Sequence, residues 1–174
     1  VTVGDILLVQ PASTDAAFTP AAEVIARAAQ CAFSVLSGNN QSGTVRTTLA
    51  NPLIVQMTPC LPGTPLNFSV TAGAGSVSPT QASIGNPPNC QASTALTLSF
   101  TAGTITVTAS RTGITSATFT ATGLAAPAAT ISLYTGNNQT GTAGRAIGPL
   151  LVKTTDAFGN DAPAAAVNFS VTGG

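Results

Sequence analysis

From Cys31 onward, apolar and polar residues alternate in short runs. The clearest run, Thr104–Thr108, puts Ile105 and Val107 on one face and threonines on the other. Gly, Pro and Asn interrupt the runs, so the pattern predicts several short strands packed as a β-sandwich. The other inward sets with the same period of two are Leu53, Val55 and Met57; Leu66, Phe68 and Val70; Leu96, Leu98 and Phe100; and Ala117, Phe119 and Ala121.

Residues 1–30 follow a different pattern. Val1–Val3 and Asp5–Val9 are typical of strands. A short helix is expected to run to about Gln30, with Thr19 as its N-cap and Pro20 in its first turn. We interpret this region as an N-terminal arm of strand plus helix, or as the tail of a preceding domain.

Part of the chain is a repeat. Ser37–Gln41 (S-G-N-N-Q) returns 98 positions later as Thr135–Gln139 (T-G-N-N-Q), and two later segments return as well. We expect a complete sandwich over 31–124, a short semi-rigid linker over 125–129, and the first half of a second copy over 130–174. Tandem copying favours a role that depends on length, stiffness or valency. The two later matches are Pro52–Gln56 with Pro149–Lys153, and Asn67–Thr71 with Asn168–Thr172.

Composition limits the chemistry. Apolar residues make up 44% of the chain, but only 6% of residues are charged, against about 25% in an ordinary globular domain. Between Ala28 and Gly144 the only charges are Arg46 and Arg111, and the chain has no histidine. An enzyme is therefore not expected, nor is a cofactor. The net charge of zero argues against nucleic acid as a partner, and no apolar run reaches the roughly 20 residues of a membrane span.

Five segments carry a recognisable combination of motifs: the S-G-N-N-Q opening, the P-L-x-V strand, Asn67–Thr80, Gln91–Leu98 and Ala102–Ala109. In this combination the chain resembles the bacterial immunoglobulin-like repeats of intimin- and invasin-type surface proteins. The resemblance implies an all-β fold of tandem immunoglobulin-like sandwiches, extracellular and either secreted or on a bacterial surface. It also implies that neighbouring modules of the same chain are its partners, strung into rods that hold a binding tip away from the cell.

Two loops depart from the pattern of that family, and each contains a cysteine. They are Thr58–Gly63 and Ile84–Cys90. Counting strands places both loops at one pole of the sandwich, which predicts a Cys60–Cys90 disulfide. Two free thiols are the alternative, and a metal site is the weakest interpretation because two sulfurs lack further ligands. Cys31 is then left unpaired, or pairs with another chain. Disulfide use fits an oxidising, extracellular location.

The loop Asp156–Asp161 is a weak candidate for a metal site. Asp156, Asn160 and Asp161 offer oxygens for Ca²⁺, which needs six or more. We favour an Asx-type turn with Gly159 at positive φ, and we predict no metal.

Tyr134 matches Leu36 in the repeat, so we expect it to pack rather than to bind a ligand. The N-glycosylation pattern N-x-S/T occurs four times, at Asn40, Asn67, Asn138 and Asn168. It recurs because the repeat recurs.

Three functions remain open. The first is a non-enzymatic structural module of an adhesin stalk or surface fibre. The second is a subunit of a self-assembling filament, in which a strand such as residues 1–9 of an identical subunit completes the half-copy at 130–174. The third is a carbohydrate- or receptor-binding module, for which a chain with no Trp and one Tyr offers little. The chain lacks an initiator Met and a signal peptide, so we interpret it as a mature or excised piece.

Overall fold

The computed structural model describes residues 31–162 and 165–173. These residues form eleven β-strands and no helix. The strands expected within residues 1–9 and the helix expected up to Gln30 lie outside the described residues. None of the described residues belongs to a helix that could span a membrane.

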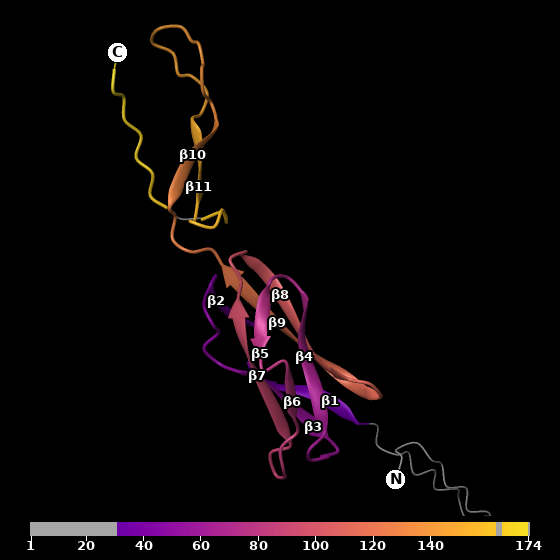
Figure 1. Cartoon of the computed structure of the whole chain (residues 1–174). Coiled ribbons are helices and arrows are strands. Elements are labelled where there is room, and N and C mark those ends of the chain that lie inside the picture. The colour runs from indigo at the N-terminus through magenta and orange to yellow at the C-terminus, as the bar shows by residue number, and fades with distance from the viewer. Residues whose placement is uncertain (1–30, 163–164, 174) are drawn as a thin grey trace, which may run out of the picture.

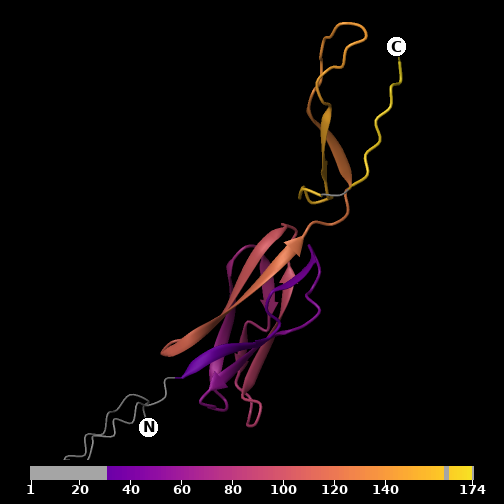
Figure 2. The ribbon, with the colours of Figure 1, turned by 180° about the vertical axis from the view of Figure 1, so that it is seen from behind.

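Nine strands form a two-layered body, which we call the first module (Figures 1 and 2). One layer has the order β5-β7-β3-β1, and the other has β6-β4-β8-β9 with β2 paired to β9. This pairing matches the two sheets of an immunoglobulin-type sandwich. The bounds are β1 Ala32–Ser37, β2 Gln41–Thr44, β3 Leu53–Thr58, β4 Pro65–Ala72, β5 Gly75–Ser78, β6 Gln81–Ser83, β7 Gln91–Leu98, β8 Gly103–Arg111 and β9 Ile114–Leu124.

The first strand joins the two layers. β1 pairs antiparallel with β3 along most of its length, and pairs parallel with β9 at Ala32 and Thr115. The chain then turns through the S-G-N-N-Q segment, and β2 runs parallel to the end of β9. The first residues of the repeat therefore form hydrogen bonds in both layers, through β1 to β3 and through β2 to β9.

The core lies between the two layers and follows the predicted alternation. Ile105 and Val107 of β8 are buried while their threonine neighbours face outward. The sets in β3 and β9 are also buried, and Leu66 and Phe68 lie inside with Val70 half-buried. The prediction of an all-β sandwich is confirmed. The predicted burial is wrong for one residue, Phe100. It is exposed because β7 ends at Leu98 and Phe100 lies in the turn before β8.

A second, smaller unit extends from the end of β9 (Figure 1). We call residues 130–173 the second module. Its hairpin consists of β10 (Thr130–Thr135) and β11 (Leu151–Thr155), which pair antiparallel. Residues 165–173, which include the repeat of the β4 sequence, contain no strand.

The two modules share the local structure of the repeat. β10 pairs with β11 in the register of β1 with β3, and in both hairpins the register is irregular directly before the turn motif. The glutamine of that motif also acts alike. Gln41 Nε2 donates to the Gly38 carbonyl at 2.7 Å, and Gln139 Nε2 donates to the Gly136 carbonyl at 2.7 Å. The repeated sequence therefore specifies the same hairpin and turn twice.

Candidate functional site: the inter-module junction

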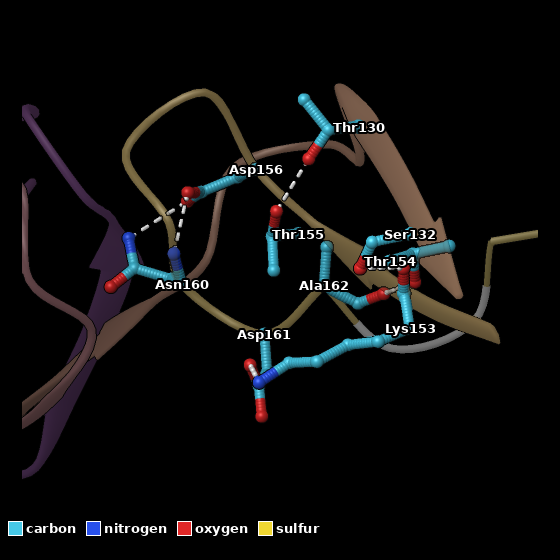
Figure 3. A network of polar contacts seen from close by, with 9 residues as sticks. All are labelled: Thr130, Ser132, Lys153, Thr154, Thr155, Asp156, Asn160, Asp161 and Ala162. Atoms are coloured by element: carbon cyan, nitrogen blue, oxygen red, sulfur yellow. Dashed lines mark hydrogen bonds and ion pairs between the residues drawn. The ribbon is translucent and has the colours of Figure 1, made fainter. Parts of the chain in front are cut away.

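The loop that follows β11 connects the second module to the first. We call Asp156–Asp161 the junction loop. It begins where β11 ends, and Figure 3 shows that its Asp156 and Asn160 side chains point toward one another. Asp156 also reaches the linker, and Asn160 reaches the turn between β7 and β8. The chain segments that meet here are distant in sequence, so these contacts belong to the tertiary structure and not to the loop alone.

Asp156 organises the junction loop. Its side chain is only 2% exposed. Oδ1 accepts hydrogen bonds from the backbone N–H groups of Phe158 at 2.8 Å and Asn160 at 2.9 Å. The first of these is an Asx turn, and Gly159 supplies the positive φ of 86° that closes the loop. Oδ2 accepts from the backbone N–H of Ala126 in the linker at 2.9 Å.

Asn160 makes the contact with the first module. Its Nδ2 donates to the Phe100 carbonyl at 2.7 Å, and its Oδ1 accepts from the Ala102 N–H at 2.8 Å. The same Nδ2 donates to Asp156 Oδ2 at 2.8 Å. One carboxamide therefore binds both the Phe100 carbonyl and the Ala102 N–H of the β7–β8 turn, and it is itself held in place by the carboxylate.

The electrostatics of Asp156 follow from these contacts. Burial favours the neutral carboxyl and would raise its pKa, but the Asn160 side chain and the backbone N–H of Asn160 donate to the ionised form. The N–H groups of Ala126 and Phe158 add to this effect. Together the donors outweigh burial and lower the pKa of Asp156 to about 2. The carboxylate is thus a charged acceptor for the linker and the loop at any ordinary pH.

The three residues considered for a metal do not converge on one site. The oxygens of Asp156 and Asn160 accept from N–H donors. Asp161 instead forms an exposed ion pair with Lys153, Nζ to Oδ1 at 2.6 Å, which raises the pKa of Lys153. Within 31–162 and 165–173, no group of three His, Cys, Asp or Glu side chains is arranged to hold a metal ion.

Sequence reasoning singled out the junction loop but missed its role between modules. The sequence predicts a local Asx turn, and the Asx turn is present. The signal for this role is a difference between the two copies of the loop, since only the second copy carries Asp and Asn. The equivalent loop of the first module, Thr58–Gly63, has no Asp or Asn and contains Cys60 instead.

The cysteines lie at the other end of the first module. Cys60 and Cys90 form a disulfide, as strand counting predicts, with Cα atoms 5.5 Å apart. β7 begins beside Cys90 and ends beside the β7–β8 turn, so the disulfide and the junction are at opposite poles. Cys31 lies near the disulfide pole, because its neighbour Ala32 pairs with Thr58. It is a free, half-buried cysteine, and a bond to another chain stays a prediction.

The expectation for Tyr134 is wrong. Tyr134 is 70% exposed, and it occupies the irregular position of the β10–β11 register, between Leu133 and Thr135. Its counterpart Leu36 is also exposed. The match between the two positions was correct, but it did not indicate packing.

Comparison with known structures finds similar chains, and three of them are the following. The D00-D0 domain of intimin is 16% identical, with a TM-score of 0.41, over 53% of this chain and 45% of that one. The D0-D1 domain of intimin is 16% identical, with a TM-score of 0.39, over 58% and 53%. FdeC, described as a broadly conserved Escherichia coli adhesin, is 19% identical, with a TM-score of 0.44, over 77% and 43%.

The chain thus spans about half the length of these structures. No protein-family model matches the chain, and no curated protein sequence matches it either.

Proposed function

We propose that this chain is a non-enzymatic structural module of a bacterial adhesin stalk or surface fibre, secreted or displayed outside the cell. Its domains would be a sandwich at 31–124, a linker at 125–129 and a second repeat at 130–174, with 1–30 as an arm or the tail of a preceding domain. The observation that carries the proposal is the junction, where Asn160 and Asp156 of one repeat bond to the preceding repeat and the linker.

The junction would make the linker stiff. Modules joined by a short segment move relative to one another unless an interface restrains them. Here the second module is attached along the chain through Leu124 and Ala126, and again through Asn160 to the β7–β8 turn. Two attachment points restrict the swing that a single tether would allow. A row of such modules would set the reach of a stalk.

The disulfide supports the same function. It closes a loop with a sequence separation of 30 at the pole away from the junction. By the chain-entropy model, such a loop stabilises the fold by roughly 3.5 kcal/mol. A disulfide also fits a location outside the reducing cytosol. The first module thus has a covalent cross-link, while its only charged residues are Arg46 and Arg111.

The experiment is a measurement of inter-module distance. Spin labels at Ser93→Cys on β7 and Thr142→Cys in the second module, in a Cys31→Ser background, report the distribution by pulsed electron paramagnetic resonance. We expect a narrow distribution that broadens in Asn160→Ala. Asp161→Ala is the matched control in the same loop, because Asp161 bonds only within the second module, and it should leave the width unchanged. An equally narrow distribution in Asn160→Ala would contradict the proposal.

A further inference from the structure

The chain enters and leaves the first module at opposite poles. β1 begins at the disulfide pole, and β9 ends at the junction, where the linker follows (Figure 2). The two strands run parallel, with Ala32 beside Thr115. Tension applied along the chain therefore pulls β1 and β9 in opposite directions, each along its own axis.

The contact between the first residues of the module and β9 lies mainly at β2. Among the described residues, β1 itself pairs with β9 only at Ala32. Gln41–Thr44 pairs parallel with Ala121–Leu124, and the Val45 N–H donates to the Leu124 carbonyl at 2.8 Å. When two strands are pulled apart along their axes, the bonds between them are strained together, whereas strands that are peeled apart lose their bonds one after another. The β2–β9 pair lies in the first of these geometries.

The turn before β2 extends the same contact. Asn39 Oδ1 accepts from the Thr120 N–H at 2.8 Å and from the Thr120 hydroxyl at 3.3 Å. The Asn40 N–H donates to the Thr120 carbonyl at 2.8 Å. Thr120 is thus bound through both of its backbone groups, directly before the residues of β9 that pair with β2.

The Gln41 side chain fastens β2 from the other side. Its Nε2 donates to the Gly38 carbonyl at 2.7 Å and to the Asn51 carbonyl at 2.9 Å. Its Oε1 accepts from the Asn51 N–H at 3.0 Å. Because Asn51 lies just before β3, the start of β2 cannot slide along β9 without also breaking these bonds.

We propose that Asn39–Thr44 and Thr120–Leu124 form a mechanical clamp, the contact that keeps the first module folded when tension is applied along the chain. The repeat supports this assignment. Residues 37–44 and 135–142 differ only by Ser for Thr at two positions, so both copies keep the Asn, Asn and Gln of the clamp. The inference deepens the stalk function and rests on it, because a stalk that holds a tip away from a cell is pulled from its ends.

The experiment holds the full chain at constant force in magnetic tweezers, between an N-terminal tag and the exposed Ala128→Cys, in a Cys31→Ser background. Asn39→Ala should shorten the lifetime of the folded first module roughly two- to tenfold, the loss for one hydrogen bond. Asn39→Asp should restore the lifetime, because a carboxylate oxygen also accepts from the Thr120 N–H. Thr71→Ala is the matched control: it removes an exposed side-chain bond to Thr108, between β4 and β8, and it should leave the lifetime unchanged.

A second attachment separates a clamp from a general loss of stability. With Thr112→Cys in place of Ala128→Cys, both handles lie where β1 and β9 begin, so the strands are peeled apart from that end. Asn39→Ala should then leave the lifetime of the first step unchanged. Three outcomes would overturn the proposal: no effect of Asn39→Ala in the first geometry, equal shortening in both geometries, or equal shortening by Thr71→Ala. The stalk function is tested by inter-module distances instead, so either proposal can fail while the other holds.

Discussion

The first module buries the hairpin β1–β3 under a second layer, whereas the second module presents the same hairpin, β10–β11, without such a layer among the described residues. The turns, the registers and the glutamine contact are alike in both. Local sequence therefore forms the hairpin by itself. Burial of that hairpin comes from the opposite layer, to which β4, β8 and β9 belong.

The strongest way to sharpen this comparison is one substitution made at matched positions. Phe68 of β4 is 2% exposed, and its counterpart Phe169 is 60% exposed. Phe68→Ala should lower the free energy of unfolding by about 3–5 kcal/mol, the usual cost of truncating a buried Phe. Phe169→Ala should change it by less than about 0.5 kcal/mol. Urea unfolding followed by circular dichroism measures both, and similar losses would show that the two copies are packed alike.

The disulfide gives the next largest difference, because only the first module has one. The double variant Cys60→Ser, Cys90→Ser should lose roughly 3.5 kcal/mol of stability by the chain-entropy model. Hydrogen exchange of the β10–β11 amides should stay as it is, since the loop lies at the opposite pole from the junction. Cys31→Ser is the control for the loss of a cysteine as such. If it costs as much as the double variant, the cross-link is not the source of the stability.

Much of the first module could be predicted from its residues. The period of two located β3, β4, β8 and β9, and strand order located the disulfide. Phe100 was misplaced because alternation does not mark where a strand ends: Leu96 and Leu98 lie in β7, and the next residue in phase falls in the turn.

The junction could not be predicted in the same way. Asn160 and Ala102 are 58 residues apart, and the repeat shows which residues are equivalent but not which copies touch. The exposure of Tyr134 has a different cause. Its match to Leu36 gives its place on the strand, but both residues lie where the strand register is irregular, and the period of two does not show which way such a residue faces.

Acid should also affect the two modules differently, and this is the smallest of the expected effects. Residues 31–124 contain no Asp or Glu, so protonation of carboxylates cannot change the stability of the first module between pH 7 and 2. The junction differs, because the pKa of Asp156 is lowered from 3.8 to about 2. A lowered pKa means that the contribution of the ionised group is complete above the ordinary value and is lost as the pH falls through about 2.

We therefore expect the inter-module distance distribution to stay narrow from pH 7 to about 4 and to broaden toward pH 2, while unfolding of the first module is unaffected. In Asp156→Asn the distribution should be broad at every pH, because a carboxamide nitrogen cannot accept the N–H of Ala126 or of the loop. Asp161→Asn should behave as the unchanged chain. If the distribution were still narrow below pH 2, the charge of Asp156 would not be what holds the modules together, and the contacts of Asn160 with Phe100 and Ala102 would be sufficient alone.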